Sequence, residues 1–411
     1  MSITSDGNRI VISGELDQSD TFRLLAAMHN SVVIKGYRDF VLDFSFCTKV
    51  HSRTMLPICS RVQHYWKSDI DISLVLPSDP RLRSLFLNTN WAFLIDFRSH
   101  GESRYRGYTH APALRFSNAK EQFQAVNKIL DILMAAISHF RREDLRSIEW
   151  AVNEITDNVI NHAQSTVGGF VQTTNYQRTS HIEFVVCDCG VGIPSTLRAT
   201  HKALRSDQEA LDAAIREGVT RDKSIGQGNG LYGTWRIAQK SEGQFYIASG
   251  YATLSSSPQD GLRIATQEVP YNGTLVVCRI GYSEKLDLSE ALVFAGRKHL
   301  PADYIATHFD LDDSGNATFD LSAESEGFGT RSAGEPVRRK LKNVIACVPD
   351  GRVKVDCSKI ALVSSSFADE VFGKLFVEMG PIEFSRRIEF TNIDPLVRNL
   401  VDRAIMQRMK V

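Results

Sequence analysis

The sequence lacks the features of a secreted or membrane-spanning protein. No window approaches the roughly 18 uninterrupted apolar residues that a membrane helix needs. The amino terminus, MSITSDGNRI, has neither the basic lead nor the apolar stretch of a signal peptide. The seven cysteines are odd in number and scattered along the chain, unlike the paired framework of a disulfide-stabilised domain. We therefore expect a cytoplasmic protein with reduced cysteines.

The chain also lacks an excess of charge of either sign. Its 48 Lys and Arg residues balance 48 Asp and Glu residues over 411 positions, so no overall basic field favours nucleic acid or an acidic membrane surface. Only the segment 403–410 is mildly basic, which is more typical of a solvated helix face than of a nucleic-acid contact. With 43% hydrophobic residues, the chain is long enough for two or three cores.

Strand-like and helical segments alternate along most of the chain, which predicts an α/β protein. A polar, Gly- and Arg-containing stretch near residue 100 and an acidic, loop-like stretch after residue 282 interrupt the pattern. We expect a domain over 1–100, a second over 101–282, an acidic linker over 283–326 and a third domain over 327–411. The first and third domains share a plan, which either an internal duplication or two unrelated α/β units would explain.

The stretch 144–164 carries the most informative helical pattern. Its apolar residues recur every three or four positions, which predicts one buried stripe made of Ile148, Val152, Ile155 and Val159. Glu154 and Asn158 are four residues apart beside that stripe, so both side chains should emerge on one side of the helix. A carboxylate that orients water, one turn from an amide oxygen that can hold Mg²⁺, suits nucleotide chemistry. Taken alone, such a pair is more often a solvated helix face.

Two glycine-containing segments follow. The strand-like run that ends in Asp188 breaks at once into Gly190 and Gly192, which can point a carboxylate into a cleft where a ligand approaches the backbone. Taken alone, it is more simply a tight turn. Further on, glycines directly precede a helical run, which suits backbone amides gathered around phosphate: Gly226, Gly228, Gly230 and Gly233. This second segment lacks the GKS or GKT ending of a P-loop.

Taken in this order, the three segments resemble the N, G1 and G2 boxes of the GHKL superfamily of ATP-binding domains, whose α/β sandwich is also called the Bergerat fold. The resemblance covers about residues 119–282 and implies ATP and Mg²⁺ as cofactors. It implies Glu154 as the catalytic or water-orienting carboxylate, Asn158 as the Mg²⁺ ligand and Asp188 as the contact to the adenine amino group. The other implied nucleotide-binding residues are Gly190, Gly192 and Thr274 at the adenine end, and Gly226, Gly228, Gly230 and Leu231 at the phosphate end.

The same resemblance implies a mobile lid over residues 194–225, with Arg221 and Lys223 just before the glycines. The chain departs from the family pattern at one position. Many kinases of the superfamily carry a basic residue directly before the histidine that follows the N box, whereas this chain has Asn161 before His162. A phosphate contact from that position is therefore not implied.

The flanking domains resemble STAS domains, the fold of anti-sigma-factor antagonists. The expected architecture is thus a GHKL α+β sandwich between two STAS-like α/β domains, the first over about 7–98 and the last over about 327–411. In STAS antagonists, a GHKL kinase phosphorylates a serine in the turn before the second helix. The first domain has Arg53 where the acceptor would fall, with Ser52 beside it, so its acceptor is expected to be lost.

The last domain keeps hydroxyl groups at the corresponding turn. Ser365 and Ser366 are the candidate phosphoacceptors there, although Phe367 replaces the glycine of the family pattern. A serine at a helix start is more often an N-cap, and Asp369, three residues after Ser366, fits a role like that of a capping box.

Two functions fit these resemblances. The first is an ATP-driven regulatory switch, in which Mg-ATP binding and slow hydrolysis change how the STAS-like domains engage a protein partner, itself a STAS or anti-sigma-like regulator. The second is an anti-sigma-type serine/threonine kinase that phosphorylates a STAS partner or its own carboxyl-terminal serines. A sensor histidine kinase fits poorly, because no His-Glu-x-x-Pro motif precedes the N box. A scaffold without chemistry and an ATP-dependent homodimer are further alternatives.

Two motifs resemble metal sites without completing them. The segment 310–321 begins like a calcium-binding EF-hand loop, but Leu321 occupies the twelfth position, where a glutamate is required. We interpret it as a solvated acidic linker. Cys187 and Cys189 flank Asp188, yet no second Cys/His pair lies nearby in the sequence to complete a zinc site.

Overall fold

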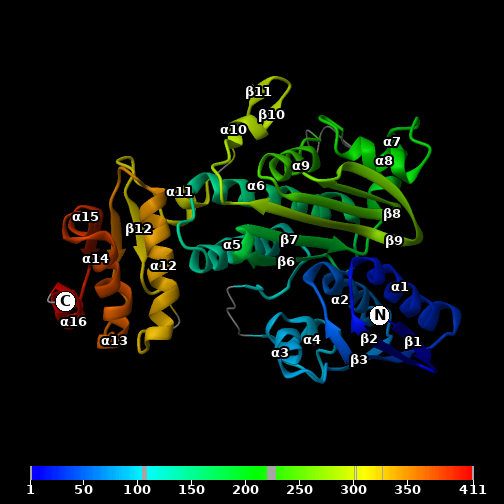
Figure 1. The fold of residues 1–411 in the computed structure, drawn as a ribbon, viewed down its shortest axis with the longest axis horizontal. Helices are drawn as coiled ribbons and strands as arrows, with labels where there is room; N and C mark the ends of the chain where they lie inside the picture. The colour runs from blue at the N-terminus through cyan, green and yellow to red at the C-terminus, as the bar shows by residue number, and fades with distance from the viewer. Residues whose placement is uncertain are drawn as a thin grey trace. The chain divides into compact units, whose positions relative to one another are not determined.

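The structure is a computed structural model that describes residues 2–103, 109–219, 228–299, 301, 303–325 and 327–409. The chain divides into two compact units, which are Met1–Ile129 with Ile148–Leu300, and Leu130–Ser147 with Pro301–Val411. Both units combine helices with sheets, so the predicted α/β class is confirmed (Figure 1). Across the described ranges, no helix is both long and apolar enough to cross a membrane.

The first hundred residues form a four-stranded sheet with its own helices. Strands β2, β3 and β4 run parallel and β1 pairs antiparallel at the edge, so helices are needed to connect the parallel strands. The strands are β1 (Ser2–Asp6), β2 (Arg9–Glu15), β3 (Asp39–Lys49) and β4 (Asp71–Val75). The helices are α1 (Gln18–His29), the π-helical turn η1 (Asn30–Ile34), α2 (Ser52–Trp66), α3 (Pro80–Asn88) and α4 (Trp91–Ile95).

A five-stranded antiparallel sheet follows in the same unit, with the strand order β5-β6-β7-β9-β8. Its strands are β5 (Leu114–Phe116), β6 (Gly169–Tyr176), β7 (His181–Asp188), β8 (Gln244–Ser257) and β9 (Gly261–Gly281). The helices along this part of the chain are α5 (Ala119–Ala136), α6 (Arg142–Asn158), the π-helical turn η2 (Val159–Ala163), the 3₁₀ turn η3 (Gln177–Thr179), α7 (Gly192–Thr200), α8 (Asp207–Ala214) and α9 (Gly230–Lys240).

Both faces of the antiparallel sheet are covered. Helices α6 and α9 lie on one face, and α1 and α2 of the first hundred residues lie on the other (Figure 1). Strand β6 is buried at every residue except its last, and β7 at every residue except its first, as strands are when both faces of a sheet are packed. One continuous apolar core joins the first hundred residues to this sheet, where it includes Phe170, Val185 and Leu275.

A buried ion cluster joins α2 to the antiparallel sheet. Glu183 of β7 is only 1% exposed, and its Oε2 accepts hydrogen bonds from Nη2 of Arg53 (2.7 Å) and Nη2 of Arg279 (3.0 Å). The guanidinium of Arg279 also lies 4.5 Å from the ring centre of Tyr176. Glu183→Ala is expected to lower the free energy of unfolding by about 3 kcal/mol, because two cations would keep their places without a counter-charge.

The matched control for that substitution is Glu15→Ala. Glu15 pairs with Lys49 at 2.6 Å, but both side chains are half exposed, and such surface pairs contribute at most about 1 kcal/mol. Chemical denaturation of the two variants measures the difference. Equal losses in both would contradict the view that the Glu183 cluster ties the first hundred residues to the sheet.

The second unit contains a parallel three-stranded sheet in the order β12-β13-β14. Its strands are β12 (Ala317–Asp320), β13 (Val353–Asp356) and β14 (Ile388–Thr391). Its helices are α11 (Tyr304–His308), α12 (Arg331–Cys347), α13 (Ser365–Ala368), the π-helical turn η4 (Asp369–Gly373), α14 (Lys374–Met379), α15 (Pro381–Arg387) and α16 (Pro395–Met409).

The stretch 283–326, expected to be an acidic linker, contains regular structure. It holds α10 (Leu288–Ala291), β10 (Val293–Phe294) and β11 (Arg297–Lys298) in the first unit, and α11 and β12 in the second. Some of its acidic side chains stabilise this local structure, because Asp287 and Asp303 are the N-caps of α10 and α11. Asp312 accepts backbone hydrogen bonds from Ser314 and Asn316, which closes a turn where the EF-hand pattern began. No cluster of metal-ligating side chains occurs among the described residues.

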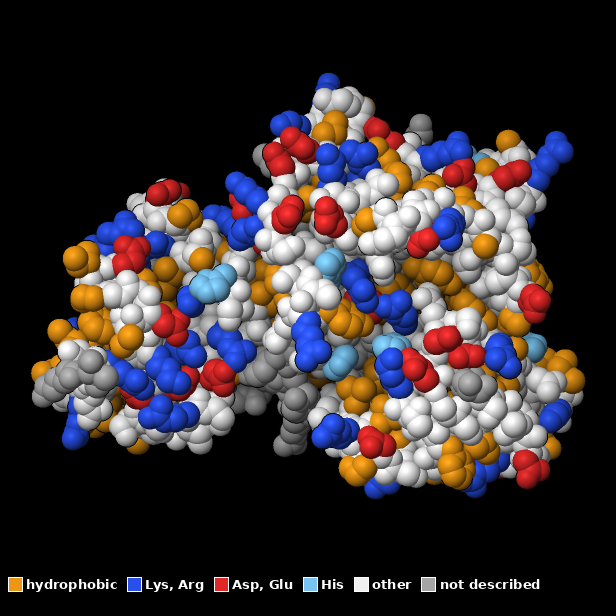
Figure 2. Space-filling view, viewed as in Figure 1, with side chains coloured by type: hydrophobic (Ala, Val, Ile, Leu, Met, Phe, Trp, Pro, Cys, Tyr) orange, Lys and Arg blue, Asp and Glu red, His pale blue; other side chains and the backbone are white. Residues whose placement is uncertain are grey.

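The visible surface carries mixed charge. On the face shown in Figure 2, acidic and basic side chains are interspersed over each unit, without a continuous field of one sign. This distribution agrees with the balanced composition of the chain.

Candidate functional site

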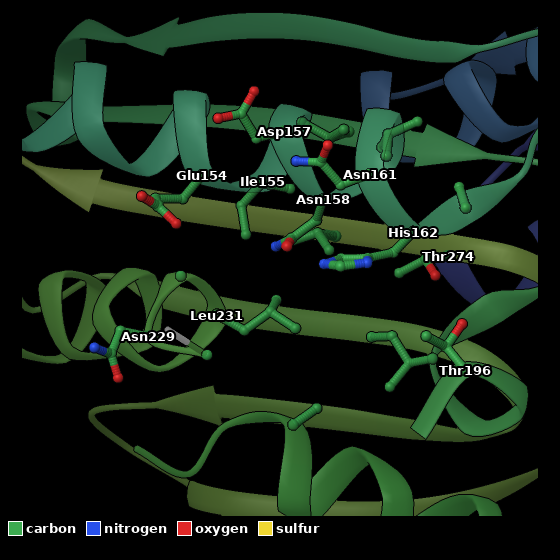
Figure 3. A pocket seen from close by; sticks show the side chains of 18 of the residues that line it. Glu154, Ile155, Asp157, Asn158, Asn161, His162, Thr196, Asn229, Leu231 and Thr274 are labelled. Carbon is green, nitrogen blue, oxygen red and sulfur yellow. The ribbon is translucent and has the colours of Figure 1, made fainter. Parts of the chain in front are cut away.

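A cavity of about 390 Å³ opens in the first unit between the antiparallel sheet and its helices. Side chains from α6, η2, α7 and the start of α9 face it, together with residues of β7 and β9 (Figure 3). Eight of the residues predicted from the sequence line it: Glu154, Asn158, Asp188, Gly192, Gly228, Gly230, Leu231 and Thr274. Segments separated by more than a hundred residues in the chain therefore meet at one place.

The helical wall presents polar groups one turn apart. Glu154 and Asn158 lie on α6, and His162 continues the same row on η2 (Figure 3). The predicted apolar stripe lies beside this row: Ile148, Val152 and Ile155 are almost fully buried, and Ile155 also lines the cavity. Burial and the nearby charge of Asp157 raise the pKa of Glu154 to about 7. Glu154 can therefore exchange a proton near neutral pH, as a general base must.

The floor of the cavity presents a buried carboxylate. Asp188, at the end of β7, is only 1% exposed, and its Oδ1 accepts a hydrogen bond from the Gly190 N–H at 2.7 Å. Burial raises the pKa of Asp188 to about 7, against backbone hydrogen bonds from Gly190 and Thr274 and the charge of Arg61, which lower it. Because a carboxylate offers about four lone-pair sites, Asp188 can accept further hydrogen bonds from a ligand.

The turn after Asp188 leaves no room for a larger residue at Gly190. The Val191 N–H donates to the carbonyl of Ala163 at 2.8 Å, and a Cβ on Gly190 would overlap that carbonyl. Gly190 thus lies beside the cavity and shapes it without lining it. The same hydrogen bond joins the end of η2, in the helical wall, to the turn at the floor of the cavity.

Helix α2 holds this turn from the opposite side of the sheet. Ser60 Oγ lies 3.2 Å from Cys189 Sγ, and Arg61 donates to the carbonyl oxygen of Asn272 at 3.1 Å. Cys187 and Cys189 are free thiols whose pKa values burial raises. Cys187 is buried and Cys189 is partly buried.

The glycine segment lies at the end of the cavity where Glu154 is found. Gly228 has a φ of +74°, which a side chain rarely adopts, and α9 begins at Gly230 directly against the Glu154 side chain. A Cβ on Gly230 would collide with that carboxylate. Leu231 extends into the space that Asn158 and His162 face (Figure 3). Gly226 lies outside the described residues, as do Arg221 and Lys223 of the predicted lid.

The wall near Asp188 is apolar. Val186 and Val276 contribute from the sheet, and Ile193 and Leu197 contribute from α7. An apolar slot with one buried acceptor suits a flat heteroaromatic ring that donates a hydrogen bond from its edge. Sequence reasoning placed Val186 in a buried strand but did not connect these four side chains.

Two further lining residues were missed because they lie in the stretch expected to be a linker. Phe294 is on β10 and His299 follows β11. The available signal was the turn-forming Gly296 alone, because the strands on either side are two residues each. Ala295 and Gly296 have positive φ values of 48° and 74° and form a tight hairpin turn.

The candidate phosphoacceptors do not line this cavity, since Ser365 and Ser366 belong to the second unit. Ser365 is exposed. The N-cap is Ser364, whose Oγ accepts from the Phe367 N–H at 3.0 Å. The expected capping role of Asp369 is wrong, because that carboxylate instead binds the guanidinium groups of Arg331 and Arg408.

The corresponding turn of the first hundred residues is inaccessible. Ser52 is 3% exposed, and its Oγ lies 3.3 Å from Thr174 Oγ1 of β6. Arg53, beside it, is held by Glu183. A kinase could not reach Ser52 while α2 is packed on the sheet.

Two segments of the chain match models of known protein families. Residues 116–232 match the model of the histidine kinase-like ATPase domain. This segment is therefore similar to a histidine kinase-like ATPase domain. The match includes the Glu154, Asn158 and Asp188 positions and ends just after Leu231, so Thr274 and the β10–β11 hairpin lie beyond it. An ATPase domain of this kind implies nucleotide binding.

In the second unit, residues 333–398 match the model of a STAS-like domain of unknown function (DUF4325). This segment runs from α12 into α16 and includes Ser365 and Ser366. The STAS-like character of residues 7–98 stays a prediction. No curated protein matches the chain.

Proposed function

We propose that the protein is an ATP-binding regulatory switch. Its ATPase domain binds Mg-ATP, hydrolyses it slowly, and thereby controls how the STAS-like parts engage a protein partner, a STAS or anti-sigma-like regulator of the cytoplasm. The observation that carries this proposal is the cavity itself, where the buried acceptor Asp188 lies at an apolar end and Glu154 and Asn158 lie at a glycine-lined end. ATP has the matching groups at its two ends, an apolar base with a donor amino group at one end and phosphates at the other.

The apolar end suits adenine. Asp188 accepts the exocyclic amino group, while Ile193 and Leu197 contact the ring face and Thr274 contributes from β9. Guanine presents a carbonyl oxygen at the same ring position, which would face Asp188 without a proton between them once that group is ionised, as it is above about pH 7. A GTP analogue is therefore expected to bind much more weakly than the ATP analogue.

The glycine end suits phosphates and Mg²⁺. Backbone at Gly228 and Gly230 approaches the ligand where a Cβ has no space, and α9 offers its amino-terminal N–H groups. Among the described residues, no cluster of ligating side chains could hold a metal alone. Asn158 would hold Mg²⁺ together with phosphate oxygens, as Mg²⁺ prefers. The ion would neutralise charge on the phosphates.

Glu154 would orient and deprotonate the attacking water. Its pKa near 7 lets it exist as the base at neutral pH, and its contact with Gly230 fixes the carboxylate beside the start of α9. ATP hydrolysis requires from the chain a positioned base, a metal ligand and backbone hydrogen-bond donors.

A serine/threonine kinase of the anti-sigma type is the second candidate. The exposure of Ser365 at the start of α13 favours it, and Glu154 would then deprotonate a serine hydroxyl in place of water. The acceptor would be a carboxyl-terminal serine of this chain, Ser365 or Ser366, or a STAS partner. An ATP-dependent homodimer is compatible with either function.

Incubation of the full chain with Mg-ATP distinguishes the two. Phosphate release is measured in solution, and mass spectrometry follows the protein itself. The switch predicts released phosphate and an unmodified chain. A phosphoserine at residue 365 or 366 that disappears in the Ser365→Ala, Ser366→Ala double variant would establish the kinase instead. Neither release nor modification by a protein that binds ATP would leave a nucleotide-binding scaffold and contradict both.

A further inference from the structure

The described ionisable side chains that line the cavity are mainly acidic, and negative charge disfavours the binding of a triphosphate. Three carboxylates line it, Glu154, Asp157 and Asp188, and no Lys or Arg does so among the described residues. The described lining groups that can carry positive charge are His162 and His299. Asn161 occupies the position where the family pattern allows a basic residue, so that position adds no cation to the cavity.

His299 reaches the cavity from the hairpin that follows the matched domain. Val293 pairs with Lys298 and Phe294 with Arg297, and the His299 N–H donates to the Leu292 carbonyl at 2.8 Å. Leu292 is fully buried beside Gly233 of α9. The base of the hairpin is thus fixed to the helix that carries the phosphate-binding glycines.

The hairpin lies at the Glu154 end of the cavity. The Phe294 ring stacks on Trp150, with ring centres 6.3 Å apart and planes inclined by 27°, and Trp150 precedes Glu154 by one helical turn. The His299 ring lies 6.0 Å from the Phe294 ring. The adenine-end groups Asp188 and Thr274 belong to the sheet, so His299 is placed with the groups assigned to the phosphates.

We propose that His299 binds the terminal phosphate of the nucleotide and makes the site prefer ATP over ADP. The inference rests on the proposed ATP binding and adds a residue from outside the matched domain. An imidazole donates an N–H in either tautomer and carries charge when protonated. Its removal costs a charge-assisted hydrogen bond, which corresponds to about a tenfold loss of affinity.

His299 lies close to the point where the chain passes from the first unit to the second. The residues from Pro301 onward belong to the second unit, so the residue that would contact the terminal phosphate is also near the end of the first unit. Loss of that phosphate on hydrolysis would remove a contact at the end of the first unit, just before the chain enters the unit that contains the STAS-like match.

The test is calorimetric titration of the full chain with ADP and, separately, with a non-hydrolysable ATP analogue, both with Mg²⁺. His299→Ala is expected to weaken the analogue about tenfold and to change ADP affinity less than about twofold. His299→Lys restores a cation and should keep the preference for the analogue. His29→Ala, an exposed histidine of α1 that does not line the cavity, is the matched control and should behave like the unchanged chain.

Equal effects of His299→Ala on both ligands, or no effect on either, would overturn the proposal while leaving ATP binding intact. A His299→Lys variant that behaves like the alanine variant would overturn the charge argument. If the unchanged chain binds neither nucleotide, the proposed function fails and this inference fails with it. His299 is exposed, so these substitutions should leave folding unaffected, which a melting curve checks.

Discussion

Asp188→Asn is expected to abolish nucleotide binding and, at the same time, to raise the melting temperature of the ligand-free protein at pH 8. Binding is lost because the acceptor for the adenine amino group becomes an amide that can present a donor. Stability rises because a buried charge is removed: Asp188 is 1% exposed and burial raises its pKa to about 7. Thermal melting with and without Mg-ATP measures both effects.

The sign of the stability change follows from proton binding. The folded-state pKa of Asp188 is above the ordinary value of 3.8, so between about pH 4 and pH 7 the folded protein binds more protons than the unfolded chain. Stability therefore falls as pH rises through this window, by up to about 4 kcal/mol. The advantage of the asparagine variant should grow from pH 5 to pH 8 and then level off.

Asp43→Asn is the control with the opposite sign. Asp43 is also buried, at 2% exposed, and burial alone would raise its pKa. Hydrogen bonds from Ser45 and the charge of Arg9 outweigh that burial, so the pKa of Asp43 is lowered instead. Asp43→Asn should therefore destabilise the protein and leave nucleotide binding unchanged. An Asp188→Asn variant that melts earlier and still binds nucleotide would contradict the assignment of Asp188.

Glu154→Gln should reduce ATP turnover at least about a hundredfold, the contribution of a positioned general base. Glutamine has the same shape, so the close contact with Gly230 is preserved and nucleotide binding should stay within about twofold. Phosphate release under single-turnover conditions measures the chemical step, and titration with the ATP analogue measures binding. Turnover that survives the substitution would show that another group deprotonates the attacking water.

The pH profile of the unchanged protein provides a second test of Glu154. A base must be deprotonated to act, and burial with the charge of Asp157 raises the pKa of Glu154 to about 7. Turnover should therefore rise from pH 6 to pH 8 and flatten above that. A rate that is flat across this range would place the base elsewhere.

The parts of the site that sequence could predict are those encoded by local pattern. The helical stripe through Ile148 and Ile155 predicts which side of α6 is buried, and this places Glu154 and Asn158 together beside it. The strand that ends in Asp188 is encoded by its apolar run in the same way. Each of these features depends on residues that are close to one another in the sequence.

The parts that sequence could not predict depend on pairings between distant segments. His299 and Phe294 reach the cavity through a hairpin whose strands are two residues each, too short for a periodic signal, within a stretch whose acidic residues resemble a linker. Strand β12 was hidden in the same stretch, although Ala317 and Phe319 are fully buried. The acidic residues of this stretch form helix caps and turns, and the alternate apolar residues of β12 are nevertheless buried in the core of the second unit.

The packing of the first hundred residues on the sheet was also beyond sequence reasoning. Arg53 and Glu183 are 130 residues apart, and neither position carries a local sign that it pairs with the other. The consequence is functional, because the face of α2 that begins at Ser52 is buried on the sheet. Any regulatory partner would have to use another surface of this part of the chain.

The measurement that tests the central claim most directly is calorimetric titration of the purified full chain with a non-hydrolysable ATP analogue and Mg²⁺, repeated with Asp188→Asn and with a GTP analogue. The account predicts saturable binding of the ATP analogue to the unchanged chain, and loss of that binding in both repeats. A folded chain that takes up no ATP analogue, or an Asp188→Asn variant that binds it as well as the unchanged chain, would contradict the account.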